Sequence, residues 1–415
     1  MKGRIGRLTA DRRFWTALYV LMALLAVVSV YEGICNALEM SQDFQYDAAC
    51  ALINGYDPYD LSLDFSKDRI PDIEGLKQFY GYFEGMGTPQ KMEANQFPSL
   101  LYILTPYALM PYIPARILWL ITNLLCTGVI IGLLRNTFMS RVDERLYPVF
   151  MMLMLAGTPW RNQLGVGQHT LFAVACFLLA VLVSGGGMET DSTESAEGAD
   201  GKRTVPKTVG AGLLLSLSYL KYTVTAPLAL YFIYKRRWKE FAISLIPHIL
   251  LTGVAAYELG EPYTDMLTKP LKVASALTGE GSIDVGALTQ GASWTVAITG
   301  IIMLFIFIAA LLLPEGKDEL FISTAALLAL VMTYHRTYDF FIMIIIFGYF
   351  ATGRMRVAEI VYLITTFAIF FVLRIYNESV ISLTVSGALY YACVIAFVVI
   401  MTENMIKGRS ADNER

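Results

Sequence analysis

The sequence contains few cysteines and few charged residues. Its five cysteines form no Cys-x-x-Cys pair, so no zinc-binding or thiol-redox motif is visible. Only 16% of the residues are charged, against about 25% in typical soluble proteins. The formal net charge of −3 gives no indication of a nucleic-acid partner. A glycine-rich phosphate loop followed by Lys and Ser or Thr is also missing, so nothing in the sequence supports binding of a soluble nucleotide.

Hydrophobic residues, in contrast, make up 56% of the chain. They are concentrated in runs of roughly 15–25 residues, and a helix needs about 20 apolar residues to cross the hydrocarbon core of a bilayer. Helices also satisfy their own backbone hydrogen bonds where water is absent, and the alternating pattern of a membrane barrel is missing from the sequence. We therefore predict an all-α, polytopic transmembrane protein with roughly ten to twelve membrane helices.

Basic residues indicate which ends of these helices face the cytoplasm. Lys and Arg cluster in the N-terminal arm, at residues 235–239, at residues 353–356 and from Lys407 onward. We therefore expect a multi-pass protein of the plasma membrane with both termini cytoplasmic. No small-residue cleavage site follows the apolar run at residues 14–31, so we expect this run to be an uncleaved first membrane helix.

These signals divide the chain into six segments. Residues 98–110 are too short to cross comfortably, so they either cross or lie near the outer interface. Residues 207–236 form either one long helix or a hairpin bent at Lys221. The predicted segments are the arm and first helix (1–31), a structured extracytoplasmic loop (32–96), membrane helices (97–184), a disordered polar loop (185–206), membrane helices with outer loops at 258–292 and 334–339 (207–403), and a cytoplasmic tail (404–415).

The first outer loop begins with two acidic residues. If residues 41–52 form a helix, Asp43 and Asp47 lie one turn apart on the same face. Phe44 and Ala48 would then rest on the membrane surface. Asp43 would stand at the outer edge of the bilayer, where it can meet substrates that the membrane carries. For an isolated aspartate at this place, a helix cap is the simpler interpretation.

Four short motifs follow one another along the first half of the chain. They are Asp43-Phe44, Gly55-Tyr56-Asp57-Pro58-Tyr59, Phe97-Pro98-Ser99 and Gly167-Gln168-His169. In this order the chain resembles the GT-C glycosyltransferase superfamily, and more closely the polyprenyl-phosphate-mannose-dependent α-mannosyltransferases that elongate phosphatidylinositol mannosides. That family has Tyr-Pro-Pro and Gly-Gln-Asn in place of the third and fourth motifs. These departures indicate a divergent member and leave the sugar and the acceptor open.

The resemblance implies a glycosyltransferase with an extracytoplasmic active site. It implies transfer of a hexose, with mannose favoured, from a polyprenyl-phosphate sugar to a hydroxyl of a glycolipid or envelope polymer, with inversion. Asp43 matches the family's catalytic aspartate and would act as the general base. The leaving lipid phosphate needs cations rather than a general acid. Candidates for binding the donor are His335, Arg336, Arg161, Gln168 and Lys221, and accessory candidates are Asp47, Tyr46, His169, Tyr338 and Asp339.

Several alternatives stay open at the level of sequence. No Asp-x-Asp pair stands near Asp43, so we expect a metal-independent reaction without a cofactor. A lipid or solute transporter or flippase is the main alternative function, although the repeated halves of many transporters are not visible. A catalytically inactive membrane scaffold is a further alternative. The sequence also leaves open the linkage formed, the oligomeric state, and whether Cys35 and Cys50 form a disulfide.

Overall fold

The computed structural model describes most of the chain. The described residues are 12–39, 44–64, 71–185, 205–276, 284–286, 294–332 and 335–351, and near the C-terminus 388, 391–392, 394–395 and 397–406. Within these residues, all regular secondary structure is helical. Asp43, residues 353–356 and most of the predicted polar loop 185–206 lie outside the described residues.

Within the described residues, five helices are long and apolar enough to cross a membrane. They are α2 (Arg12–Glu39), α8 (Tyr112–Thr137), the unit of α12 (Val205–Ser218), η2 (Tyr219–Lys221) and α13 (Tyr222–Tyr234), α14 (Trp238–Leu259) and α17 (Trp294–Leu312). Two further helices, α10 (Thr158–Val166) and α11 (Thr170–Val183), pass the same test together but meet at an angle of 105°. The prediction of a polytopic helical membrane protein is thereby confirmed. The total number of spans stays a prediction, because residues 352–387 lie outside the described part of the chain.

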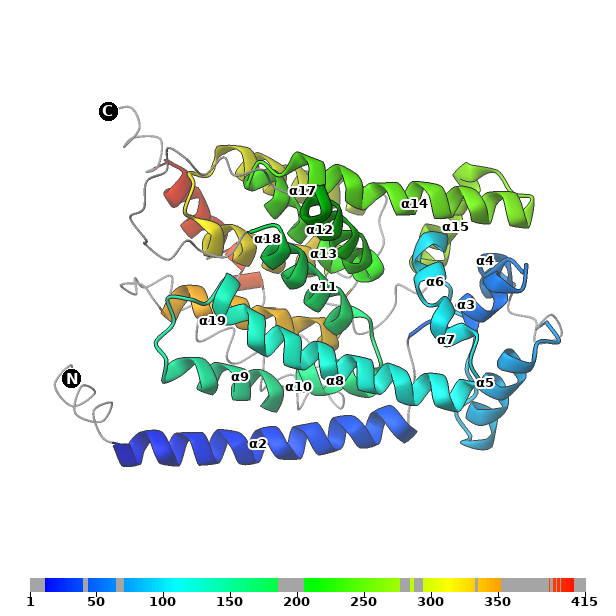
Figure 1. The fold of residues 1–415 in the computed structure, drawn as a ribbon, viewed down its shortest axis with the longest axis horizontal. Coiled ribbons are helices and arrows are strands. Elements are labelled where there is room, and N and C mark those ends of the chain that lie inside the picture. Colours follow the sequence, from blue (N-terminus) through cyan, green and yellow to red (C-terminus); the bar gives the residue numbers. More distant parts are fainter. Residues whose placement is uncertain are drawn as a thin grey trace.

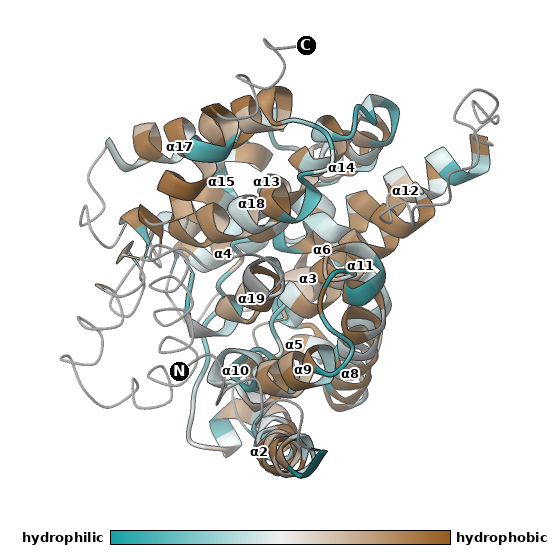
Figure 2. Cartoon of the chain, turned by 90° about the vertical axis from the view of Figure 1, so that its left-hand side faces the viewer, coloured by the Kyte–Doolittle hydropathy of each residue, from teal (hydrophilic) through white to brown (hydrophobic). Residues whose placement is uncertain are grey.

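The long helices run along the longest dimension of the molecule, with α2 and α14 at opposite edges (Figure 1). Figure 2, which looks nearly along the axes of α2 and α8, shows both helices mostly in the colours of hydrophobic residues. Val27, Leu125 and Val296 are 66%, 66% and 78% exposed, respectively. Such extensive apolar exposure is unfavourable in water, so these sides of the bundle suit contact with lipid.

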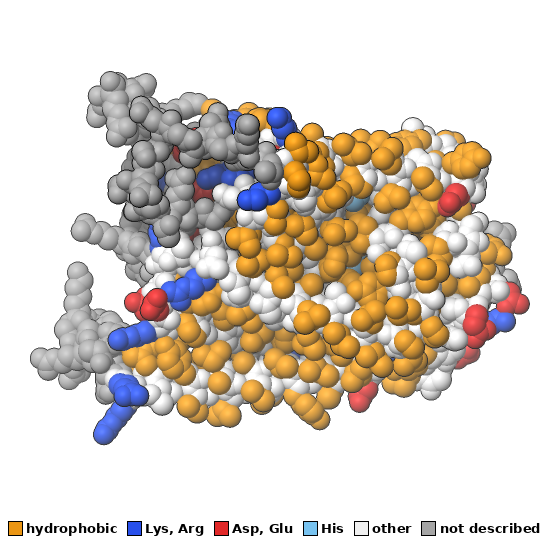
Figure 3. Space-filling view, in the orientation of Figure 1, with side chains coloured by type: hydrophobic (Ala, Val, Ile, Leu, Met, Phe, Trp, Pro, Cys, Tyr) orange, Lys and Arg blue, Asp and Glu red, His pale blue; other side chains and the backbone are white. Residues whose placement is uncertain are grey.

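Short helices gather at the end of the bundle that Figure 1 shows on the right. Figure 3 shows acidic side chains at this end, whereas most of the basic side chains visible in that view gather toward the opposite end. The short helices are α3 (Tyr46–Ile53), α4 (Pro58–Leu63), α5 (Glu74–Gly85), α6 (Pro98–Ile103) and α7 (Thr105–Ala108), with the longer α15 (Tyr263–Ala276) beside them. Further helices in the described part of the chain are α9 (Leu146–Ala156), α18 (Asp318–Met332), η3 (Thr337–Met343), α19 (Ile344–Ala351) and an apolar helix at Phe397–Ile406.

The start of the outer loop differs from the prediction. Helix α2 continues to Glu39 rather than ending at residue 31. The helix expected from residue 41 begins only at Tyr46, because Gln45 has a φ of 61° in the left-handed region. Phe44 and Ala48 are fully buried at 0% exposure, so the prediction that they rest on the membrane surface is wrong. The Phe44 ring packs against Trp119 and Tyr107, and α3, which carries Ala48, packs against α5, α6 and α7.

A turn and a capped helix follow α3, within the Gly55-Tyr56-Asp57-Pro58-Tyr59 motif. Gly55 has a φ of 78°, a conformation that glycine adopts without strain. Asp57 then caps α4, since its Oδ1 accepts hydrogen bonds from the amides of Tyr59 and Asp60 at 2.8 and 3.3 Å. Pro58 occupies the first turn of that helix, where its missing N–H costs nothing. The two cysteines considered for a disulfide, Cys35 and Cys50, are both free thiols.

The two segments with alternative interpretations take definite forms. Residues 98–110 fold as α6 and α7, which are too short to cross and lie at the same end as α3. Residues 205–234 form one continuous span, interrupted by the single 3₁₀ turn of η2, so the alternative of a hairpin bent at Lys221 is wrong. Thr225 Oγ1 donates to the carbonyls of Ser218 and Lys221 at 2.6 and 3.0 Å. These bonds satisfy carbonyls that the interrupted helix leaves without their usual partners.

An ion cluster joins α15 to α4. Lys269 Nζ lies 2.6, 3.1 and 3.3 Å from carboxylate oxygens of Asp57, Asp60 and Glu261. Partial burial lowers the pKa of Lys269, but the hydrogen bonds and charges of Asp57 and Asp60 outweigh this effect and raise the pKa above its usual value. The ammonium group therefore stays charged and holds three acids together.

We expect Lys269→Met to destabilise the protein by about 1–3 kcal/mol, because three carboxylates would remain close together without a counter-charge. Thermal unfolding of the purified protein in detergent measures this change. The matched control is Lys77→Met, since Lys77 pairs with Asp72 although both side chains are mostly exposed, at 58% and 84%. Little change is expected there, because water screens exposed ion pairs. Equal losses in the two variants would contradict the special role of Lys269.

Candidate active site

A group of charged and polar side chains is buried where η2, η3 and the bend between α10 and α11 meet. Lys221 Nζ lies 3.5 Å from Asp339 Oδ2, and His335 Nδ1 lies 2.7 Å from the same oxygen. The side chains of Asp339, His335 and Lys221 are 0%, 1% and 10% exposed, respectively. Charges so deeply buried are costly unless they are paired. Removal of Asp339, His335 or Lys221 is therefore expected to destabilise the other two.

Two polar residues complete this group, which we call the buried polar cluster (Gln168, Thr170, Lys221, His335, Tyr338 and Asp339). Gln168 Oε1 accepts a hydrogen bond from Lys221 Nζ at 3.1 Å, and its Nε2 donates to the Tyr338 hydroxyl at 3.3 Å. Thr170 donates to the other oxygen of Asp339. Lys221 also lies over the ring of Tyr338, 5.4 Å from its centroid. Residues far apart in the sequence thus form one hydrogen-bonded network.

The bend between α10 and α11 brings His169 against the outer loop. Gly167 ends α10 with a φ of 73°, and His169 is the residue immediately before α11. The fully buried His169 ring has its Nε2 3.1 Å from the carbonyl oxygen of Phe44. A carbonyl can only accept, so Nε2 carries the hydrogen and the neutral ring leaves Nδ1 as an acceptor. His169 Nδ1 has no hydrogen-bond partner within the described residues.

The aromatic ring of Phe44, like its carbonyl group, makes contacts with distant parts of the chain. It stacks on Trp119 of α8, with ring centroids 5.6 Å apart. Trp119 Nε1 donates to the Gly167 carbonyl at 2.6 Å, and the Trp119 ring meets His169 edge to face at 5.5 Å. The main chain directly after Asp43 is therefore fixed on α8 and on the α10–α11 bend. Asp43 itself lies outside the described residues.

The two arginines predicted to bind the donor are placed differently. Arg161 of α10 forms an ion pair with Glu32 of α2, and so joins these two helices rather than the buried polar cluster. Arg336 directly follows His335, and its side chain is exposed. Of the five residues predicted to bind the donor, the structure brings together His335, Gln168 and Lys221.

The accessory candidates of the outer loop are engaged within that loop. Tyr46 donates its hydroxyl hydrogen to the Met110 carbonyl at 2.7 Å. Asp47 is buried and accepts hydrogen bonds from the Tyr80 hydroxyl at 3.0 Å and the Ala48 amide at 2.9 Å. Burial raises the pKa of Asp47 to about 6. The sequence analysis did not identify Tyr80 or Thr170 as site residues. The one available signal was that Thr170 directly follows the Gly167-Gln168-His169 motif.

Asp47→Asn is expected to stabilise the protein at pH 7 by up to about 3 kcal/mol, because the pKa of Asp47 rises from 3.8 to about 6 on folding. The unfolded chain releases this proton first, so the wild-type free energy of unfolding falls as the pH rises from about 4 to about 6. The amide of Asp47→Asn keeps an acceptor for Tyr80 and has no proton to release. Thermal unfolding at pH 4 and pH 7 measures the difference.

The control for this prediction is Asp265→Asn in the first turn of α15, for which we expect no comparable gain. Wild type and Asp47→Asn should differ in stability much less at pH 4 than at pH 7, because at pH 4 the folded Asp47 is protonated and the unfolded side chain is only partly ionised. A loss of stability at pH 7 in Asp47→Asn would contradict the predicted effect of burial.

Acidic residues gather elsewhere as well. Among the described residues, Asp57, Asp60 and Glu261 are the group of three whose ligand atoms lie within 4.8 Å of one another. The ammonium of Lys269 already contacts all three side chains. The donor atoms in this group are therefore used to bind a lysine, and the geometry describes an ion cluster that joins two helices.

Comparison with known protein families identifies the class of membrane protein to which this chain belongs. The model of Glycosyltransferase family 87 matches residues 98–334, which is more than half of the chain. No curated protein and no solved structure matches the chain. The chain is thus a membrane glycosyltransferase, which acts on a sugar donor and an acceptor. It belongs to glycosyltransferase family 87. The matched range contains Gln168 and Lys221, whereas Asp43, His335 and Asp339 lie outside it.

Proposed function

We propose that this protein transfers a hexose, with mannose favoured, from a polyprenyl-phosphate sugar to an acceptor hydroxyl at the extracytoplasmic face of the plasma membrane. Asp43 acts as the general base. It takes the proton of the acceptor hydroxyl while the hydroxyl oxygen forms a bond to the anomeric carbon. The bond between that carbon and the phosphate oxygen breaks, and the polyprenyl phosphate leaves as an anion. One base and no covalent intermediate give inversion at the anomeric carbon.

The observation that carries this proposal is the contact between His169 and the carbonyl of Phe44. It connects the residue directly after Asp43 to Gln168 and Thr170, the neighbours of His169 in sequence, which belong to the buried polar cluster. Phe44, which follows the proposed base in the sequence, and the buried cation Lys221 thus come from separate parts of the chain that meet at the bend between α10 and α11. A transferase needs this arrangement, because base and phosphate-binding groups act on opposite sides of one anomeric carbon.

The buried polar cluster suits the binding of the donor phosphate. Lys221 supplies a positive charge in surroundings from which water is largely excluded, where a cation stabilises an anion most strongly. Asp339 orients Lys221 and His335 and keeps the cluster stable before the donor binds. His335 lies beside Arg336, and that exposed arginine is well placed to meet the more accessible phosphate oxygens.

The distribution of charge supports the proposed orientation. Lys and Arg gather toward the end of the bundle opposite the short helices, and acidic side chains lie at the end that holds α3, α4 and α5 (Figure 3). Cytoplasmic ends of membrane helices are enriched in Lys and Arg. The short helices and the outer loop are therefore extracytoplasmic in this proposal, with the N-terminal end of α2 in the cytoplasm.

The test is transfer of radiolabelled mannose from polyprenyl-phosphate mannose to extracted membrane lipids, by membranes that contain the wild-type protein or Asp43→Asn. Label in a lipid product with wild type alone supports the proposal and identifies the acceptor. Equal labelling with both proteins would exclude Asp43 as the base. If neither protein transfers mannose, polyprenyl-phosphate glucose and arabinose are tested in the same way, and failure of all three would overturn the lipid-phosphate donor.

A further inference from the structure

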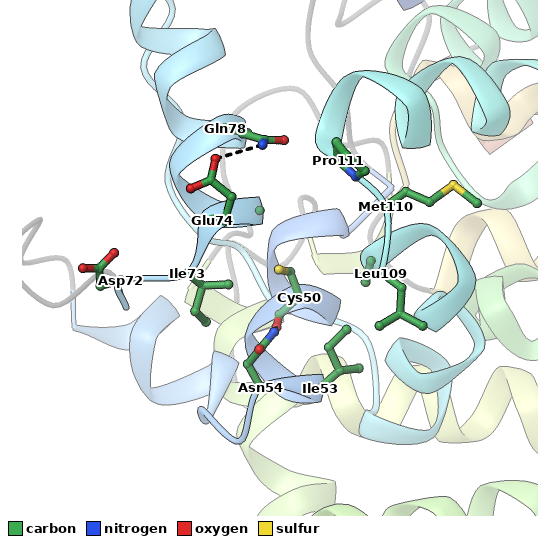
Figure 4. A pocket seen from close by; sticks show the side chains of 12 residues that line it. Cys50, Ile53, Asn54, Asp72, Ile73, Glu74, Gln78, Leu109, Met110 and Pro111 are labelled. Atoms are coloured by element: carbon green, nitrogen blue, oxygen red, sulfur yellow. Dashed lines mark hydrogen bonds between the residues drawn. The ribbon is translucent and has the colours of Figure 1, made fainter.

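A cleft of about 510 Å³ opens at the end of the molecule that carries the short helices. This volume lies within the range of about 300–1,000 Å³ that is usual for sites of small ligands. Figure 4 shows Asp72, Ile73 and Glu74 on one side of the cleft, and Leu109 and Met110 on the other. Its floor is formed by the second half of α3. The cleft is separate from the buried polar cluster, with which it shares no residue.

The lining combines polar groups with apolar surface. Exposed carboxylates and amides come from Asp72, Glu74 and Asn54. Ile53 and Leu109 supply apolar surface, and the Leu109 side chain is 73% exposed. Sugars present hydroxyl groups at their edges and C–H groups on their ring faces, so they need both kinds of contact. Carboxylates accept hydrogen bonds from hydroxyl groups, and amides both donate and accept them.

Close packing and hydrogen bonds hold the walls of the cleft in place. Helix α5 approaches α3 so closely at Gly75 that a Cβ there would lie 2.9 Å from both Cys50 Sγ and the Tyr46 hydroxyl. The Gln78 side chain receives a hydrogen bond from the Tyr112 amide at 3.2 Å and donates one to Glu74 at 3.0 Å. These contacts fix the α5 wall of the cleft relative to α3 and α8.

Helix α3 extends from the cleft toward Phe44, the residue that follows the proposed base in the sequence. Tyr46 begins α3, while Cys50, Ile53 and Asn54 at its other end line the cleft. At 1.5 Å per residue, α3 spans about 12 Å. Tyr46 also bonds to the carbonyl of Met110, a cleft residue, and its ring lies 5.8 Å from that of Phe44. A chain of a few sugar units is long enough to occupy the cleft and reach the region of Phe44.

We propose that this cleft binds the oligosaccharide part of the acceptor, and so selects acceptors that already carry several sugar units. The proposal rests on the proposed function, because it assigns a substrate class to that reaction. In this arrangement the growing end of the acceptor lies near Asp43, and sugars closer to the lipid or polymer occupy the cleft. The cleft then influences acceptor binding and leaves the chemical step unchanged.

The test uses Leu109→Trp, which places a large ring at the mouth of the cleft. Leu109 is mostly exposed, so the substitution removes little packing. The matched control is Met86→Trp at the end of α5, where Met86 is 47% exposed and does not line the cleft. The probes are fluorescent mannotetraose and maltotetraose, and thermophoresis measures their binding to purified protein in nanodiscs. We expect wild type and Met86→Trp to bind at least one probe, and Leu109→Trp to bind it at least tenfold more weakly.

Unchanged binding by Leu109→Trp would overturn the proposal, as would the absence of binding of both oligosaccharides to wild type. These measurements do not depend on transfer, so a wild-type protein that binds an oligosaccharide but transfers no sugar would overturn the proposed function alone. Where transfer is observed, Leu109→Trp should raise the KM for the acceptor and leave kcat and the KM for the donor unchanged. A fall in kcat with an unchanged acceptor KM would contradict a role in acceptor binding.

Discussion

Asp43→Asn is expected to lower the rate of sugar transfer by about 10²–10⁴-fold, the usual contribution of a positioned general base. The amide has nearly the same shape as the carboxylate but cannot take the proton of the acceptor hydroxyl. The loss should therefore appear in kcat, while the KM for the donor changes little. Initial rates with a radiolabelled polyprenyl-phosphate sugar measure both constants.

The control for this variant is Asp265→Asn, an equal change of charge in the first turn of α15, which should keep wild-type activity. Thermal unfolding of Asp43→Asn should match that of wild type, so that lost activity cannot be attributed to lost folding. Asp43→Asn with more than a tenth of the wild-type kcat would contradict the assignment. The proposed donor could then still stand, but the proton would have to go to another acceptor.

Breaking the buried pair of Lys221 and Asp339 is expected to have the largest effect on stability. Either Lys221→Met or Asp339→Asn should lower the free energy of unfolding by about 3–5 kcal/mol, because each leaves a buried group without its partner. The double variant should lose clearly less than the sum of the two single losses, since it removes both charges together. Thermal unfolding in detergent measures all three variants.

Activity measurements distinguish the contribution of this pair to stability from the proposed role of Lys221 in binding the donor phosphate. Lys221→Met and the double variant should both lose sugar-transfer activity, because each lacks the cation that stabilises the leaving phosphate. This loss is expected even if the double variant recovers stability. The matched control is Lys235→Met, which breaks the 2.9 Å contact between Lys235 and Asp318. Lys235 is 31% exposed, so this variant should lose less stability and keep its activity. Full transfer by the double variant would exclude Lys221 from binding the donor.

Local patterns in the sequence were sufficient for the helices and for some turns. Long apolar runs of the sequence fold as α8, α14 and α17, because a helix satisfies its own backbone hydrogen bonds in a bilayer. The turn at Gly55 and the cap at Asp57 also follow from local chemistry. The prediction was less accurate for the first bound of α3, which begins at Tyr46 because Gln45 has a left-handed conformation.

The candidate site depends far more on tertiary structure. The sequence singled out Gln168, Lys221 and His335 one by one, but their spacing along the chain does not indicate that they share one cluster. Arg161 was an equally good candidate by residue type, and only the packing of α10 against α2 gives it Glu32 as a partner. The contact of His169 with Phe44 likewise requires the 105° bend at Gly167.

The sequence by itself therefore determined the membrane environment and the helices, and its motifs indicated the class of enzyme. Hydrophobic length and turn chemistry act within a few residues of the chain, so they can be recognised without a structure. The tertiary structure alone decided which polar side chains are buried together and which cleft opens beside α3. Those choices depend on helix packing between distant segments, where one buried charge must find its partner and each close approach depends on a particular small residue.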